Sequence, residues 1–142
     1  MRLFYFIVLS SVLLSCKNNS TENAEPEKSL SDSLLQQVLD GHDVAMPKMM
    51  KLERLQKEAQ AELDSLKKQS ARKNAGRIAL LHSTVKNMNY ADVAMHEWME
   101  GFKYDSLKDN EPARVDYLKI QLEIVNEMKD VVLSSLEKAD SV

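Results

Sequence analysis

Apolar side chains recur every three or four residues from Ser29 to the end of the chain, and polar residues fill the positions between them. This spacing places the apolar side chains along one face of an α-helix. In the first helical segment, which ends within Ser70 to Gly76, two rows of residues seven positions apart form a seam of the kind that packs helices together. The rows are Leu35, His42, Met49, Gln56 and Leu63, and Val38, Ala45, Leu52, Ala59 and Leu66.

Gly41 and Pro47 interrupt this first segment. Proline removes one helical hydrogen bond and its ring clashes with the preceding turn, so we expect either a kink between residues 41 and 47 or a full break there. At the far end of the segment, Gly76 is expected to stop the helix, because glycine readily adopts the backbone conformation of a helix C-terminus.

Two further amphipathic helices follow. One is expected from about Arg77 to Phe102, and the other begins after Asn110, a capping residue, has Pro112 in its first turn and runs to about Ala139. Their seam rows are Ile78, Val85, Asp92 and Met99 with Leu81, Met88, Met95 and Phe102, and then Val115, Leu122, Lys129 and Leu136 with Leu118, Val125, Val132 and Ala139. The pattern predicts an all-α fold, an antiparallel three-helix bundle with a long first helix.

Composition narrows the function classes. The 142 residues include three Gly and three Pro, which suits long helices and leaves no Gly-rich phosphate-binding loop. A single Cys permits neither a disulfide within the chain nor a Cys-based zinc site. The formal net charge of -3 provides no basic surface, so nucleic acid is not an expected partner.

The first sixteen residues resemble the lipobox signal of bacterial lipoproteins. Arg2 precedes an apolar run from Leu3 to Leu14, which is too short to span a bilayer, and Ser15 is followed directly by Cys16. In such proteins the signal is cut before the cysteine, whose sulfur carries a diacylglycerol and whose new amine is acylated. The resemblance implies a signal peptide at residues 1–15, lipidation of Cys16 and stable attachment to a membrane, because two or three acyl chains anchor firmly.

Residues 16–28 comprise the lipidated cysteine and a polar tether, Lys17 to Lys28, whose composition cannot build a packed core. As a flexible coil the tether would reach about 20 Å from the lipid headgroups. Residues 29–142 form the predicted bundle domain. We expect a bacterial cell-envelope location, lipid-anchored at the outer membrane, on its periplasmic face or at the cell surface.

Antiparallel pairing across the first turn places Met49 level with Trp98, in the core, and brings two methionine-rich motifs together. Their thioethers could bind Cu(I), or a His and a Met could hold a haem between helices. The candidate ligands are His42, Met46, Met49, Met50, Met95 and Met99. The alternative, which we favour, treats the methionines as adaptable packing residues, with no metal and no cofactor.

The remaining polar residues have structural interpretations. His42 lies in the seam, where it can donate to a carboxylate or a backbone carbonyl, whereas His82 and His96 share a stripe that should face solvent. Asp92 occupies a seam position, so it is expected either to form an ion pair with Arg54 or to remain partly hydrated at the edge of the seam.

Catalytic motifs are incomplete. The run from His96 to Glu100 begins like the zinc-protease motif His-Glu-x-x-His but ends in Glu, and no Glu-x-x-His or Gly-x-Ser-x-Gly element occurs. The sequence therefore predicts a protein that is not an enzyme.

Several segments together resemble a group of short helical lipoproteins of Bacteroidota of unknown function, some of which are labelled viral A-type inclusion protein. The segments are the lipobox, residues 42–49, a Lys/Glu/Leu-rich run, residues 91–99 with their Trp-Met pair, and residues 133–139. The resemblance implies an envelope location and a helical form, and it transfers no activity or site residue. The expected function is a non-enzymatic helical interaction or structural module that binds an envelope protein or its own copy.

Overall fold

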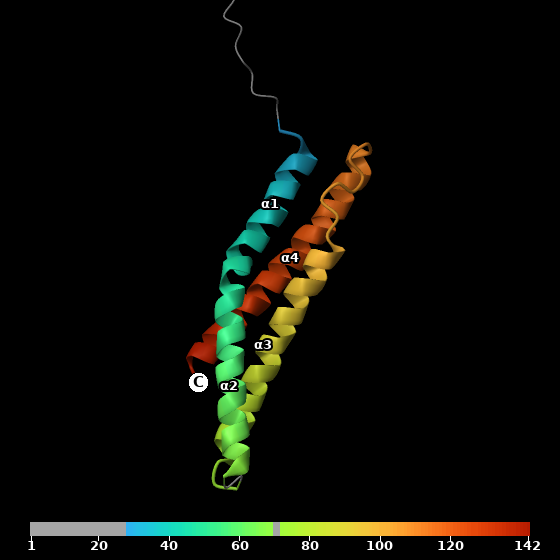
Figure 1. The fold of residues 1–142 in the computed structure, drawn as a ribbon. Helices are drawn as coiled ribbons and strands as arrows, with labels where there is room; N and C mark the ends of the chain where they lie inside the picture. Colours follow the sequence, from blue (N-terminus) through green and yellow to red (C-terminus); the bar gives the residue numbers. More distant parts are fainter. Residues whose placement is uncertain (1–27, 70–71) are drawn as a thin grey trace, which may run out of the picture.

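The computed structural model describes residues 28–69 and 72–142, and every regular element in them is helical (Figure 1). The elements are α1 (Leu30–Ala45), the 3-10 turn η1 (Met46–Lys48), α2 (Met49–Lys68), α3 (Ala75–Gly101) and α4 (Glu111–Asp140). The elements α1, η1 and α2 follow one another as a long first arm, α3 returns beside it, and α4 runs antiparallel to α3. The predicted antiparallel three-helix bundle with a long first helix is confirmed.

The interruption at Pro47 is a short 3-10 turn that keeps the chain helical. Met46 and Lys48 on either side of the proline both have right-handed helical backbone angles, and the Met46 N–H still bonds to the His42 carbonyl. The two parts of the arm pack against different partners, α1 against α4 and α2 mainly against α3. The turn thus redirects the arm from one neighbour to the other.

Gly41 serves close packing and lies outside the turn. It is buried within α1, and a Cβ atom built on it would lie only 3.0 Å from Val125 Cγ1 of α4. A glycine here lets the two helix backbones approach, at the cost of a lower helix propensity.

The prediction that Gly76 stops the first arm is wrong. The helix α2 already ends at Lys68, where the Gln69 N–H bonds to the Leu66 carbonyl, and Gly76 lies in the first turn of α3. No described glycine has a positive φ, so none acts as a left-handed cap.

The start of α4 follows its sequence signals. Asn110 caps the helix by accepting the Ala113 N–H at 3.2 Å, and Pro112 lies in the first turn. The preceding connection is fastened by Arg114, which is buried and donates to the backbone carbonyls of Tyr104 and Ser106. The side-chain hydrogen bonds of this buried guanidinium go to loop carbonyls, a role that seam spacing does not reveal.

The seam of the first arm is confirmed, because none of its ten residues is exposed. On α3 the predicted face is rotated: the row from Ile78 to Met99 is only half-buried, whereas Thr84, Ala91 and Trp98 are buried. The reason is that α3 packs against both α2 and α4, so its buried arc is wider on the α4 side than a two-row seam assumes.

The residues of the main hydrophobic core range in sequence from Leu34 to Leu136, and they come from the first arm, α3 and α4. Residues 28–142 therefore contain a complete core of their own, and their number suffices for independent folding. None of the helices in the described ranges is long and apolar enough to cross a membrane. The signal peptide, Cys16 and all but the last residue of the tether lie outside the described residues.

Candidate functional site

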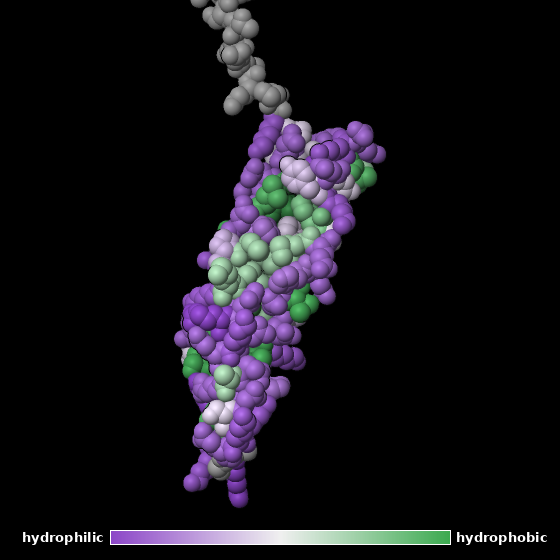
Figure 2. All heavy atoms as spheres, in the orientation of Figure 1, coloured by the Kyte–Doolittle hydropathy of each residue, from purple (hydrophilic) through white to green (hydrophobic). Residues whose placement is uncertain are grey.

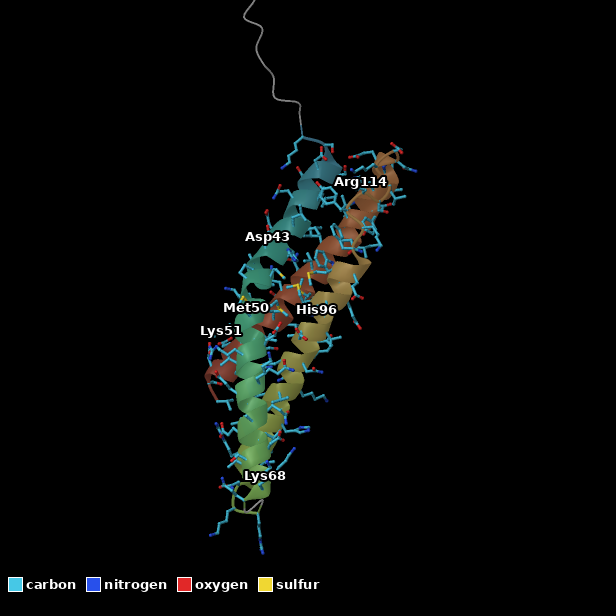
Figure 3. The ribbon with its side chains drawn as sticks, viewed as in Figure 1. Asp43, Met50, Lys51, Lys68, His96 and Arg114 are labelled. Atoms are coloured by element: carbon cyan, nitrogen blue, oxygen red, sulfur yellow. The ribbon has the colours of Figure 1, made fainter. Side chains whose placement is uncertain are left out.

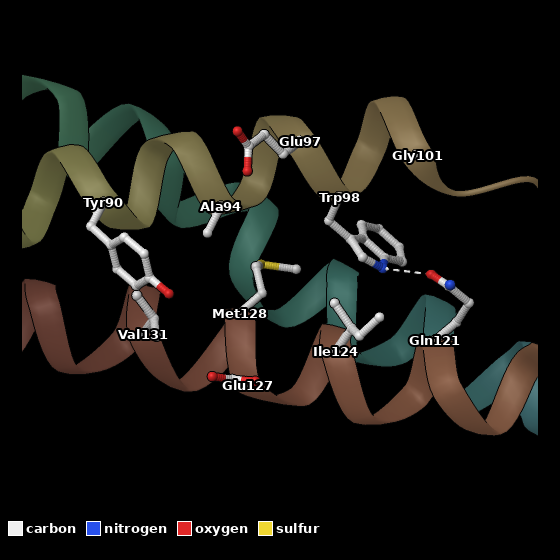
Figure 4. Close-up of a pocket in the computed structure, with 10 residues that line it drawn as sticks. All are labelled: Tyr90, Ala94, Glu97, Trp98, Gly101, Gln121, Ile124, Glu127, Met128 and Val131. Atoms are coloured by element: carbon white, nitrogen blue, oxygen red, sulfur yellow. Dashed lines mark hydrogen bonds between the residues drawn. The ribbon is translucent and has the colours of Figure 1, made fainter.

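The face of α3 and α4 that is turned away from the first arm carries a groove of about 380 Å³ (Figure 4). We call it the α3/α4 groove. The residues that line it are Tyr90, Ala94, Glu97, Trp98 and Gly101 of α3 and Gln121, Ile124, Glu127, Met128 and Val131 of α4.

The floor of the groove is apolar and partly open to solvent. Tyr90 is 60% exposed and Ile124 is 42% exposed. Ile120, one turn before Ile124 on α4, does not line the groove but adds exposed apolar surface, at 57%, beside it. Large apolar side chains that are gathered on one face and left uncovered mark surfaces for binding other molecules. The groove therefore differs from the interior of the bundle, where large apolar side chains of Leu, Val and Met are buried.

Trp98 joins the groove to the core. Its indole N–H donates to Gln121 Oε1 across the groove at 3.2 Å, and its ring stacks on Phe102 with centroids 4.9 Å apart. The Trp98 side chain is 8% exposed, which confirms its predicted place in the core. The donor bond satisfies the polar end of a side chain that is otherwise buried in apolar contacts.

Two carboxylates stand on opposite margins of the groove. Glu97 projects from α3 and Glu127 from α4, with the apolar residues between them (Figure 4). Within the described residues neither forms an ion pair, and no Lys or Arg lines the groove. The groove thus combines an apolar floor with uncompensated negative charge.

Seam reasoning missed this groove, although a signal was present. On α4, apolar residues outside both predicted seam rows recur at helical spacing, at Ile120, Ile124 and Val131. On α3, Tyr90 also lies outside the predicted rows. A second apolar stripe on a helix that already has a core-facing stripe indicates a second binding face.

The predicted convergence of the methionines is confirmed. Met46, Met49, Met50, Met95 and Met99 all line one hollow of about 340 Å³ between the first arm and α3, together with Pro47, Glu53 and His96. Figure 2 shows apolar surface at this level of the bundle, and Figure 3 shows Met50 and His96 on the facing helices. We call this site the methionine hollow.

The methionines of the hollow fall into two groups. Met49 and Met95 are buried core residues, as the packing interpretation expects. Met50 is 83% exposed and Met46 is 41% exposed, so packing does not explain these two. These two side chains are accessible from solvent.

The histidine at the methionine hollow is His96 and not His42, which was the expected ligand. His42 does not line the methionine hollow: its ring lies 5.5 Å from the Trp98 ring, and its Nδ1 lies 2.9 Å from Asp43 Oδ1, the carboxylate contact that its seam position suggested. His96 lines the hollow instead and is exposed, and His82 is exposed as predicted.

The ring of His96 is oriented by Asp92, one turn earlier on α3. His96 Nδ1 lies 2.8 Å from the Asp92 backbone carbonyl and 3.4 Å from Asp92 Oδ1. The hydrogen bond to that carbonyl, followed by the charge of Asp92, raises the pKa of His96 above its ordinary value. Because a carbonyl oxygen only accepts, this hydrogen bond requires a proton on His96 Nδ1. The second ring nitrogen, Nε2, takes no part in the contact with Asp92.

Of the two alternatives for Asp92, the ion pair with Arg54 does not form, and the residue lies half-buried at the edge of the seam. Arg54 Nη1 instead bonds to Glu58 Oε1 at 2.8 Å, one turn along α2, because that partner needs no reach across the bundle. Asp92 is half-buried, and its Oδ1 is shielded and accepts no hydrogen bond within the described residues. Its nearest cationic partner is His96.

Within the same residues, no group of three or more His, Cys, Asp or Glu side chains could hold a metal ion. Comparison of the chain with protein-family models, with curated proteins and with solved structures finds no match. The function of the protein is therefore inferred from its own residues and their geometry.

Proposed function

We propose that this protein is a lipid-anchored protein of the bacterial cell envelope whose bundle is a non-enzymatic interaction module. The observation that carries the proposal is the α3/α4 groove, where Tyr90 and Ile124 expose apolar surface on a face that none of the described helices covers. The occupant is a helical segment of another envelope protein.

A helix fits this groove because two antiparallel helices form its walls. From Tyr90 to Gly101 the groove follows α3 for about 16 Å, or three helical turns. A helix laid there would contact both walls through residues at positions i, i+3, i+4 and i+7, the arrangement of amphipathic helices in hydrophobic grooves. Docking would extend the three-helix bundle to four helices at this level.

The anchor follows from the lipobox. Acylation at Cys16 would attach the tether to the outer membrane and keep the bundle close to it. Ser31 donates from its backbone N–H and its hydroxyl to the Glu111 carboxylate, which joins the start of α1 to the start of α4. The start of α1, which follows the tether in the sequence, therefore lies at the end of the bundle that carries the α3–α4 connection (Figure 1).

Photo-crosslinking in cells tests the proposal. A benzophenone amino acid replaces Tyr90 in the full chain, and a matched probe replaces Val44, an exposed apolar residue of α1 outside the groove. We expect a discrete adduct with another envelope protein from position 90, its loss when Ile124→Ser is added, and no such adduct from position 44.

Three outcomes would contradict the proposal. They are the absence of any adduct from position 90, the same adducts from both positions, and an adduct of two copies of this chain alone. The last result would assign the groove to self-association.

Soft-metal binding is a second candidate, favoured by the exposed thioethers of Met46 and Met50. A metal-ligating histidine usually donates its other ring N–H to a carbonyl or carboxylate, as His96 Nδ1 is placed to do toward Asp92. Thioether and imidazole ligands suit Cu(I). In this candidate His96, which lines the hollow, replaces His42 in the predicted ligand set.

Competition with a Cu(I) chelator, together with an absorption scan for haem, tests this candidate on the fragment from Lys17 onward. Met50→Leu with Met99→Leu should abolish stoichiometric Cu(I) binding, whereas Met88→Leu with Met128→Leu, two buried methionines outside the hollow, should preserve it. These changes nearly conserve volume, so the fold is expected to persist. Equal Cu(I) binding by both variants, or none by the wild type, would reject the candidate.

A further inference from the structure

Within the α3/α4 groove, we infer that the docked segment is a cationic amphipathic helix, with Lys or Arg on both sides of its apolar stripe. The inference rests on the proposed function and adds the chemistry of the partner. Its basis is the pair of margin carboxylates, Glu97 and Glu127, that flank the apolar floor without a cation of their own within the described residues.

The negative charge extends beyond the two lining residues. Glu100 lies one turn after Glu97 on α3, and Glu123 and Asp130 lie one turn to either side of Glu127 on α4. All three are exposed, and none forms an ion pair within the described residues. These three carboxylates do not line the groove, but they add negative charge to the exposed surface of α3 and α4 beside it.

This charge pattern selects among occupants. A second copy that used the same face would bring Glu97 and Glu127 against like charges, which opposes symmetric pairing. The tether, residues 17–28, contains three Glu, two Lys and no large aliphatic side chain, so it offers neither apolar anchors nor net positive charge. A cationic amphipathic helix supplies both features.

The geometry also sets the spacing in the partner. Its apolar residues would cover Tyr90, Ile124 and Val131, and its cations would flank them to reach Glu97 on one wall and Glu127 on the other. Arg can meet a carboxylate with two parallel hydrogen bonds, so Arg at these flanks would fix orientation as well as charge. The charges are exposed, so they chiefly favour the correct partner and speed its encounter, while the apolar floor holds it.

Two synthetic probes test the inference on the fragment from Lys17 onward. One is an amphipathic helical peptide of leucine and lysine, and the other replaces every lysine with glutamate. Glu97→Gln with Glu127→Gln neutralises the margins, and Glu53→Gln with Glu58→Gln makes the same charge change on α2, outside the groove. Ile124→Ser removes apolar floor, with Val44→Ser as its control.

We expect the lysine peptide to bind and the glutamate peptide not to bind. The margin variant should weaken binding about twofold to thirtyfold, because it removes two exposed ion pairs, and the α2 variant should leave binding unchanged. Ile124→Ser should weaken binding and Val44→Ser should not. Equal binding of both peptides, equal effects of the two charge variants, or no binding of the lysine peptide would overturn the inference.

The result is separable from the proposed function. If both peptides bind equally and Ile124→Ser weakens both, the groove stands as the docking site and only the charge of the partner is wrong. If Ile124→Ser and Val44→Ser have the same effect, the groove itself is not the site, and both claims fail.

Discussion

Trp98 is the residue on which the core and the groove both depend. It is buried, stacks on Phe102 and donates to Gln121. Trp98→Ala should lower the free energy of unfolding by about 3 to 5 kcal/mol, because a large aromatic side chain leaves a cavity that its neighbours fill only partly. Urea unfolding followed by circular dichroism measures this loss.

Tyr90→Ala is the control for that prediction, because Tyr90 lines the same groove but is mostly exposed. Its cost should be clearly smaller. An emission maximum of the folded protein like that of tryptophan in water would contradict the burial of Trp98.

Gly41 provides a second prediction at this scale. Gly41→Val adds methyl groups where even a Cβ would lie 3.0 Å from Val125 Cγ1, and Val125 is completely buried, so it cannot move aside easily. Overpacking of this kind should destabilise the protein by about 1 to 3 kcal/mol.

Gly76→Val is the matched change, because nothing lies within 4 Å of a Cβ at position 76. It should alter stability by no more than about 0.5 kcal/mol. Equal effects of the two changes in thermal unfolding would show that α1 and α4 do not approach closely at Gly41.

The sequence identified these residues better than it identified their roles. The sequence marks Gly41 as unusual in a helix, but the reason, close approach to Val125, depends on a residue more than eighty positions away. His42 and His96 were both noticed, yet which of them would face the methionine hollow depends on how each helix is rotated, and a two-row seam does not fix that rotation. Residue type and spacing are local, whereas these roles are set by packing between helices.

At the scale of the helix, α3 carries the pair formed by Asp92 and His96, one turn apart. The backbone carbonyl and the charge of Asp92 raise the pKa of His96, so a proton titration followed by NMR should find it above the ordinary value of about 6.5. Asp92→Asn should lower this pKa only part of the way, because the carbonyl remains.

The raised pKa of His96 also determines how the stability of the folded protein changes with pH. Since the pKa is higher in the folded state, the favourable contribution of His96 is fully present below about pH 6.5 and is lost as the pH rises through the folded value. The side chain is exposed, so the contribution is small. His96→Gln should remove this part of the pH dependence and His82→Gln should not. A pKa for His96 at or below the ordinary value would contradict the Asp92 contact.

The helices themselves were largely predictable, since apolar periodicity, the Asn110 cap and Pro112 marked α4 closely. The wider buried arc of α3 was not predictable, because Thr84 and Ala91 are small or polar and are buried where α3 packs against both α2 and α4. The α3/α4 groove was not predictable for a related reason. Ile120 and Ile124 indicate a second apolar face of α4 only once the first arm is known to cover the other face. Seam rows assign one face to each helix, and here α3 and α4 use two.

For the whole molecule, membrane attachment is the prediction with the clearest readout. Cys16 in the lipobox should direct the full chain into the detergent phase of a phase-partitioning assay, and Cys16→Ala should move it to the aqueous phase. Acyl chains contribute about 0.8 kcal/mol for each buried CH₂, so the difference should be nearly complete. Aqueous partitioning of both proteins would remove the anchor from the proposed function.

The central claim is that a helix docks between α3 and α4, and Trp98 reports on it directly because it is the only tryptophan of the chain and lines the groove. The most direct measurement is the emission of Trp98 while the leucine and lysine peptide is added to the fragment from Lys17 onward. A saturable change in emission that Ile124→Ser weakens and Val44→Ser leaves intact is the predicted result. Saturable binding of the peptide with no change in Trp98 emission would place the docking site elsewhere and contradict the claim.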